Sequence, residues 1–493
     1  MASRPHDTFA AVRRLGQRGS LKDELMNAQD PRDESRVPVV LLLSAQRSRN
    51  LGDWAMLDSA RAFIAESFGA NVEMEVYGAQ DSPTQFGGPG VTSHSSLLVR
   101  IKKWVVQRRS DSSRPGGWGI SADGVRGPLG WGIRLVLAGW FAIALLLAWL
   151  RRRLRLPVPK SVSRVCRPLD RVSAVVTTGG GWLNSNFILT LYEHLHILLA
   201  ARLIYRIPVF IVGEQVGPLQ HRLDRFLVRV VFDRAQLIAL RDQRSVVLAR
   251  TLTRQPECVR LFCDWAYRWQ ETGISRTDGP PRLGVNLRRA HYSPFSSDEL
   301  IVLARVLDDI HQETGAELHF IPICFDSHES DDLALSELRD RCASATAITL
   351  HTELSSPHDC ISLVGMMDLN ISVSYHLCLF SLMTDVPCLG IATSDYYAVK
   401  LGGLLELFDA ADWLVRAPQL EVGPFLDKLR QHLSDSASHR ERLRDVNRRL
   451  IRQRQDEGRH LRELLATSLS QSNCVNVLDG ANDSGPQLMR TAP

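Results

Sequence analysis

The chain has 493 residues, of which 44% are hydrophobic and 23% charged, a composition that suits a globular protein with two domains and substantial cores. Its formal charge is only +5, which is too small an excess to indicate a nucleic-acid partner. The nine cysteines are scattered and show no metal-ligand spacing. We therefore expect reduced thiols, no metal centre and a cytoplasmic protein.

The first domain is predicted to span residues 37–270, after a polar and disordered segment over 1–36 that lacks the apolar core of a signal peptide. The apolar run 37–44 predicts a parallel strand, and a turn and a helix that begins near Gly52 follow it. In this geometry backbone amides meet an anionic ligand. The candidate ligand-binding residues of the turn are Asn50, Gly52 and Asp53, although Asp53 also suits an ordinary N-cap.

Residues 79–170 are predicted to be an insertion in this domain, with a hydrophobic helix over about 131–150. The uncharged run 135–150 is about 24 Å long as a helix, against ~30 Å for the hydrocarbon core of a bilayer. A single crossing would also place strands of one sheet on opposite sides of the membrane. We therefore expect a helix that dips into the membrane surface, with its basic flanks toward anionic lipid. A helix buried in the domain and a true span are the alternatives.

Two further strand ends of the first domain carry candidate binding residues. The strand predicted over 172–178 runs into three glycines, which let the backbone turn tightly and approach a ligand. The strand predicted over 237–240 is followed by Arg-Asp-x-x-Ser. Each motif is also compatible with a simple structural turn. The candidate residues are Gly179, Gly180, Gly181 and Arg241.

The second domain is predicted to span residues 281–420, where strands and helices alternate after a polar, proline-ended segment. Its first strand ends at Arg288. Helices are predicted over 421–468, with most of their arginines on a solvated face, and a disordered tail over 469–493.

The stretch 371–400 predicts a strand, a helix, a second strand and a second helix. Ser374 is placed to cap the first helix, and Tyr375 and His376 form its first turn at the carboxyl edge of the sheet. Tyr397 and Lys400 return to the same edge. A histidine, tyrosines and a lysine around a helix N-terminus suit a phosphorylated or carboxylated ligand, whereas the alternative is that Tyr375 and His376 merely cap and pack the helix.

Together these motifs resemble the polysaccharide pyruvyl transferase family over about residues 37–78 and 170–415. Ser374-Tyr375-His376 and Tyr397-x-x-Lys400 occupy the places of that family's C-terminal signature, with Ser374 where many members carry an arginine. The motifs Asn-x-Gly-Asp, Gly-Gly-Gly and Arg-Asp-x-x-Ser match the family in the first half of the chain.

The resemblance implies two Rossmann-like doubly wound α/β domains that face a cleft, in the manner of glycosyltransferase-B enzymes. It also implies transfer of a pyruvyl group from phosphoenolpyruvate, the donor substrate, onto a saccharide of a cell-surface polysaccharide or its precursor as a ketal, without a further cofactor. His376 is then the candidate acid–base group, and Arg241, Arg288 and Lys400 are candidate anion clamps, although each also suits a salt bridge. A glycosyltransferase that uses a nucleotide sugar and a non-catalytic scaffold remain the alternatives.

Overall fold

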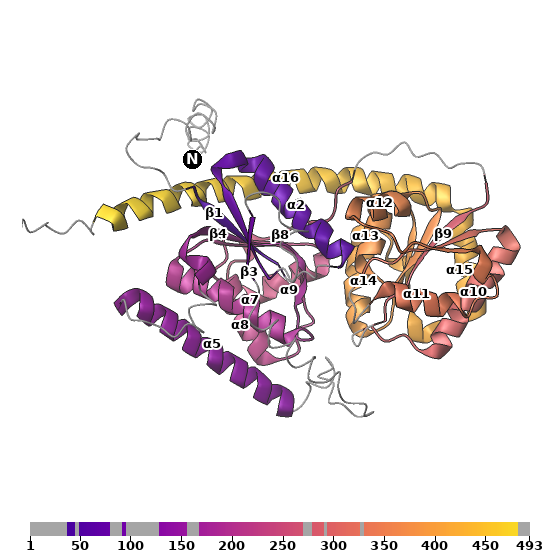
Figure 1. Ribbon diagram of the computed structural model, residues 1–493, viewed down its shortest axis with the longest axis horizontal. Helices are drawn as coiled ribbons and strands as arrows, with labels where there is room; N and C mark the ends of the chain where they lie inside the picture. The colour runs from indigo at the N-terminus through magenta and orange to yellow at the C-terminus, as the bar shows by residue number, and fades with distance from the viewer. Residues whose placement is uncertain are drawn as a thin grey trace, which may run out of the picture. The chain divides into compact units, whose positions relative to one another are not determined.

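The computed structural model describes residues 37–44, 49–78, 91–94, 128–154, 167–269, 279–289, 293–325 and 330–481. The chain forms two parallel sheets, each covered by helices (Figure 1). This confirms the predicted fold class of two Rossmann-like α/β domains. The first sheet lies within residues 39–261 and the second within 282–416, inside the predicted domain ranges. The predicted disordered segment over 1–36 and the end of the predicted tail lie outside the described residues.

The first sheet has the strand order β3-β2-β1-β4-β6-β7-β8, with β5 beside β6. The strand bounds are β1 (Val39–Leu43), β2 (Glu73–Tyr77), β3 (Val91–His94), β4 (Val172–Thr177), β5 (Gly180–Leu183), β6 (Val209–Val216), β7 (Leu237–Leu240) and β8 (Val259–Leu261). Strand β1 is apolar at every position because its alternate side chains enter two different hydrophobic cores. Val40 and Leu42 lie in one core, and Leu41 and Leu43 lie in the other.

The helices of the first half are α2 (Leu51–Phe68), α5 (Pro128–Leu154), α7 (Ile188–Ala200), α8 (Arg222–Phe232) and α9 (Gln243–Leu252), and a π-helical turn over Ala201–Tyr205 continues α7. Helix α2 begins at Leu51 and is capped by Asn50, whose side chain accepts hydrogen bonds from the amides of Gly52 and Asp53. The alternative role of Asp53, as the N-cap, is therefore excluded. Asp53 lies in the first turn, where an acidic residue suits the helix dipole.

The second sheet has the strand order β11-β10-β9-β12-β13-β14. Its strands are β9 (Arg282–Asn286), β10 (Glu317–Phe320), β11 (Ile348–Leu350), β12 (Leu369–Ser372), β13 (Cys388–Ala392) and β14 (Leu414–Arg416). Its helices are α10 (Ser297–Thr314), α11 (Asp331–Arg339), α12 (Pro357–Gly365), α13 (Tyr375–Met383) and α14 (Asp395–Leu407). The chain ends in α15 (Val422–Ser434) and the 46-residue helix α16 (Ser436–Ala481).

In three places the structure adds to or differs from the sequence prediction. The insertion over 79–170 contributes an edge strand to the first sheet, because β3 pairs with β2 in parallel. Part of the predicted glycine turn is strand β5, which pairs with β6. Helix α16 continues to Ala481, although disorder was predicted from residue 469. The rest of 79–127 lies outside the described residues.

Within the described part of the chain, two helices are long and apolar enough to cross a membrane when only length and composition are considered. The segment Ile188–Tyr205 is 72% buried, as the core helix of a globular domain is, whereas Trp131–Leu150 within α5 is only 22% buried. Composition alone therefore does not separate these two helices, but their packing does.

Candidate functional site

The carboxyl edges of the two sheets meet at the loop that precedes α2. Asn50 forms an antiparallel bridge with Cys324, and the amide of Leu51 donates to the carbonyl of Ile323 at 2.9 Å. This contact joins the start of α2 to the segment after β10. The ends of strands from both domains are thereby brought to one place, which is where open α/β sheets bind ligands.

His376 lies in the first turn of α13 and packs against α2. A Cβ atom on Gly52 would lie 2.1 Å from Cγ and Nδ1 of the His376 ring, so only glycine lets the two helices approach this closely. The side chain is 6% exposed, and its Nε2 has no hydrogen-bond partner among the described residues. Burial, with the nearby charges of Lys400 and Arg241, holds the pKa of His376 well below its usual value. The imidazole is therefore neutral at pH 7.

Arg241 follows β7 and is almost completely buried. It donates from one guanidinium nitrogen to Asp264 at 3.1 Å and from another to Gln215 at 2.6 Å. Its guanidinium also lies 3.8 Å from the centroid of the Tyr375 ring, a cation–π contact that connects the two domains. The buried ion pair and the contact with the ring hold the Arg241 guanidinium in one orientation. Its Nε has no hydrogen-bond partner among the described residues.

Lys400 lies among three tyrosines of the second domain. Its Nζ is 5.5 Å from the centroid of Tyr375, 5.6 Å from that of Tyr396 and 5.7 Å from that of Tyr397. Burial of the ammonium, followed by the charges of Arg241 and Arg288, lowers the pKa of Lys400 to about 7. An anion bound beside this lysine would favour its charged form.

The glycine loop faces the same cluster from the first domain. A Cβ atom on Gly181 would lie 3.0 Å from the hydroxyl of Tyr396 and 3.6 Å from Oε1 of Gln215. Gly180 has a φ of +122°, in the region that favours glycine, and a Cβ there would lie 3.9 Å from Oε2 of Glu214. The glycine loop therefore comes close to side chains of both domains, as its glycines predict.

Glu214 is completely buried near the end of β6, and burial raises its pKa to about 8. Trp182 and Thr177 lie close enough to oppose part of this increase, although neither makes a well-aligned hydrogen bond to the carboxyl oxygens. The carboxyl group therefore keeps its proton at pH 7 and is able to donate it.

Two predicted binding residues have structural partners. Arg288 donates to both carboxyl oxygens of Asp331, at 2.9 and 3.1 Å, which is the salt bridge that the sequence left open as the alternative. Ser374 occupies the N-cap position of α13 without making a side-chain cap. Its amide instead donates to the side chains of Asn286 and Ser372, which fix the turn between β12 and α13.

Buried polar atoms without a hydrogen-bond partner gather at this edge. Within the described structure they include both carboxyl oxygens of Glu214, Nε2 of Gln215, Nε of Arg241 and Nε2 of His376. Buried polar atoms in folded proteins are nearly always hydrogen-bonded, so these atoms are available to water or to a ligand. The cluster offers positive charge, a neutral imidazole and a neutral carboxyl group within one buried region.

The structure brings most of the predicted site residues into this cluster, including Gly52, Gly180, Gly181, Arg241, Tyr375, His376, Tyr397 and Lys400. Asn50 and Asp53 lie at the start of α2 beside it, and Gly179, whose φ is +85°, turns the chain toward it. The sequence interpretation missed Glu214, Gln215 and Asp264. Their signal was available, because Glu214 and Gln215 are polar residues inside an otherwise apolar strand.

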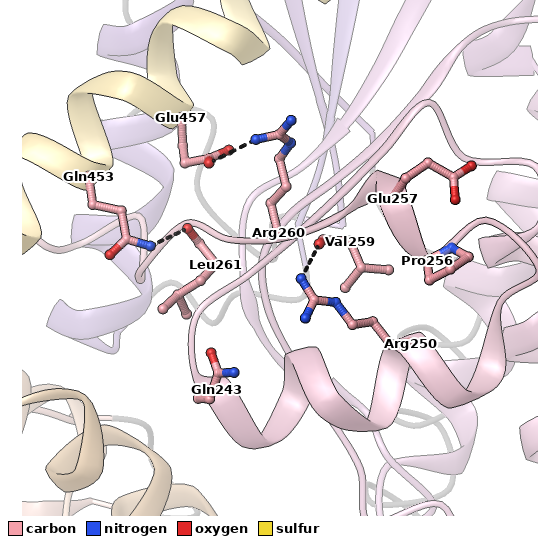
Figure 2. A pocket seen from close by; sticks show the side chains of 9 residues that line it. All are labelled: Gln243, Arg250, Pro256, Glu257, Val259, Arg260, Leu261, Gln453 and Glu457. Atoms are coloured by element: carbon pink, nitrogen blue, oxygen red, sulfur yellow. Dashed lines mark hydrogen bonds and ion pairs between the residues drawn. The ribbon is translucent and has the colours of Figure 1, made fainter. Parts of the chain in front are cut away.

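A separate hollow of about 430 Å³ lies between α9, β8 and α16 (Figure 2). Its lining shares no residue with the cluster, and several of its polar groups contact one another. Arg260 pairs with Glu457 at 3.1 Å, and Gln453 donates to the carbonyl of Leu261. We therefore place the candidate site at the cluster. Among the described residues, no group of three or more His, Cys, Asp or Glu side chains is placed to hold a metal ion.

The chain is a transferase by its family, which a family model identifies. The family model described as polysaccharide pyruvyl transferase matches residues 50–395, and the chain belongs to this family. A search of curated proteins finds no match.

Solved structures are similar only in fold. HepE from Anabaena in complex with UDP-glucose is 11% identical, with 90% of this chain and 99% of that one covered and a TM-score of 0.45. An α,α-trehalose 6-phosphate synthase from Burkholderia multivorans is 12% identical, with 92% and 99% covered and a TM-score of 0.48. Similarity at this level carries no argument about substrates.

Proposed function

We propose that this protein transfers a pyruvyl group from phosphoenolpyruvate to two hydroxyls of a saccharide, forming a ketal on a cell-surface polysaccharide or its precursor. The observation that carries the proposal is the concentration of unpartnered buried polar atoms beside Arg241 and Lys400. The donor carries a carboxylate and a phosphate, and guanidinium and ammonium groups are suited to hold both.

The reaction needs two proton acceptors and one group that delivers a proton to carbon. One hydroxyl adds to C2 of the donor while C3 gains a proton, so the methylene becomes a methyl group. The C2–O bond to phosphate then breaks, and the second hydroxyl adds to C2. Of the two hydroxyl protons, one replaces the proton delivered to C3 and the other leaves with phosphate, so the reaction is balanced.

The described side chains suit these steps. Neutral His376 takes a hydroxyl proton, as general bases do, and Glu214, protonated at pH 7, is the candidate proton donor. Arg241 and Lys400 hold the donor, and Lys400 gains its full charge as the anion binds. Gly181 of the first domain and Tyr396 of the second both border the cluster, and a Cβ atom on Gly181 would lie 3.0 Å from the tyrosine hydroxyl.

The buried position of His376 favours a second candidate, a non-catalytic member of the fold in which the cluster only joins the domains. At 6% exposure, the ring serves equally well as a packing residue against Gly52. The glycosyltransferase alternative has no comparable observation in its favour.

A ligand panel separates these candidates. Phosphoenolpyruvate should raise the melting temperature and nucleotide sugars should not, because a ligand that binds the folded state stabilises it by mass action, by ~2.7 kcal/mol at a hundred times its dissociation constant. Stabilisation by nucleotide sugars alone would support the glycosyltransferase alternative, and stabilisation by neither would support the scaffold.

A substitution then tests the role of His376. With a saccharide acceptor, His376→Gln should lower turnover by about 10²–10⁴-fold while phosphoenolpyruvate still binds, because glutamine keeps much of the size but cannot carry a proton. Turnover near that of the wild type would make His376 a packing residue.

A further inference from the structure

Helix α5 is fixed to the first domain along its length. Near its start, Arg134 is buried and donates from Nε to both carboxyl oxygens of Asp224, at 3.1 and 3.2 Å. Further along, Phe141 stacks on His196 with ring centroids 4.8 Å apart, and Ala148 is buried in the same core. A helix held in this way to the soluble domain cannot cross a bilayer, so the spanning alternative is excluded.

The opposite side of α5 is apolar and exposed. The helix lies outermost beside α7 and α8 in Figure 1. At about 100° per residue, its outward side chains occupy one half of the helix and the buried ones the other. Between residues 131 and 150 the only charged side chain is Arg134, and it points into the protein. The outward residues are 37% to 71% exposed and include Leu135, Val136, Trp140, Ile143, Leu146 and Trp149.

We propose that this outward face of α5 docks flat on an anionic membrane surface on the cytoplasmic side, without crossing it. An apolar face of this size on a soluble protein marks a binding surface, and its chemistry here favours lipid. Trp140 lies at one margin of the face and Trp149 at the other, and tryptophan prefers the headgroup level of a bilayer.

Positive charge lies next to both ends of the face. Three consecutive arginines, 151–153, follow its C-terminal end, and Arg153 is exposed. At the other end, Trp131 contacts His221 edge-on, and the adjoining helix α8 exposes Arg222 and Arg225. Basic residues beside an apolar helix face are the pattern of peripheral binding to anionic lipid. The surface does not depend on the proposed reaction, but it would keep the enzyme beside a lipid-linked acceptor.

The test is sedimentation of the full-length protein with phosphatidylcholine vesicles, with and without phosphatidylglycerol. Wild type should sediment with the anionic vesicles, and the triple variant Val136→Gln, Ile143→Gln, Leu146→Gln should bind more than tenfold more weakly. The matched control is Ile301→Gln with Leu333→Gln, whose side chains are 56% and 66% exposed in the second domain and should not affect binding. Arg151→Gln, Arg152→Gln, Arg153→Gln should reduce the preference for the anionic lipid.

The melting temperature of the apolar triple variant should equal that of the wild type, because the three side chains contact solvent. The proposal is overturned if wild type fails to sediment with anionic vesicles, or if the triple variant sediments equally well. It is also overturned if light scattering shows a dimer that the triple variant separates, since the face would then join two protein copies.

Discussion

Replacement of Asp224 tests how α5 is held to the first domain. Arg134 and Asp224 are 1% and 0% exposed, and the carboxylate accepts two hydrogen bonds from Arg134 Nε. It accepts two more, from Ser185 Oγ at 2.7 Å and Tyr192 Oη at 3.0 Å. Asp224→Ala therefore leaves a guanidinium buried without its counter-charge. Removing one partner of a buried ion pair destabilises by about 3–5 kcal/mol, which is the loss we expect in the free energy of unfolding.

The assay is urea denaturation of Asp224→Ala, of Arg134→Leu and of the variant that combines them. Because the double variant buries no unpaired charge, its loss should be well below the sum of the two single losses. An exposed ion pair contributes about 0–1 kcal/mol. If Asp224→Ala loses no more than that, the pair is solvated, and the assignment of α5 to the first domain is refuted.

Four further predictions concern the cluster. Gly52→Ala puts a methyl group where the His376 ring lies, so the ring must move. A displacement of about 1 Å can lower turnover by about 10²-fold, which is the fall we expect in a kinetic assay. Unchanged turnover would show that the ring moves freely. Because the pKa of Lys400 is about 7, this side chain loses its charge as the pH rises. The dissociation constant of phosphoenolpyruvate should therefore rise by up to about tenfold per pH unit above 7. Calorimetry should find this pH dependence in the wild type and not in Lys400→Arg. The free energy of unfolding should increase between pH 7 and 10.5 in the wild type, since only the unfolded chain keeps that proton. Glu214→Gln should retain phosphoenolpyruvate binding but lose at least about tenfold in turnover, and equal turnover would remove Glu214 from proton transfer.

The elements of the fold could be predicted from the sequence because their hydrophobic patterns are local. The run 37–44 predicts β1, and the alternation of strands and helices after residue 281 predicts the second sheet. Strand β5 was missed because glycine is depleted in strands, so Gly180 and Gly181 indicate a turn. The last turns of α16 were missed because small polar residues such as those after 468 favour disorder by composition alone.

The sequence pointed to several residues of the cluster but not to their pairing. The family signature identified His376, Arg241 and Lys400, whereas the partners depend on which strands become neighbours. Arg241 pairs with Asp264, 23 residues away, and Arg288 pairs with a carboxylate 43 residues away. Neither separation matches a helical or strand period, so no local sequence pattern predicts these ion pairs. Burial likewise gives Glu214 its raised pKa, and burial is a property of the assembled sheets.

Helix α16 connects the two domains. Asn447 donates to the carbonyl of Leu382 in the second domain, while Gln453 and Arg462 donate to Leu261 and Ser67 in the first. The single helix α16 therefore runs along both domains, and its residues 447 and 462 are about 22 Å apart. Because the chain already crosses between the domains once before β9, this helix is a second link. The two domains are therefore joined by two connections of the chain, one of which is a continuous helix hydrogen-bonded to both.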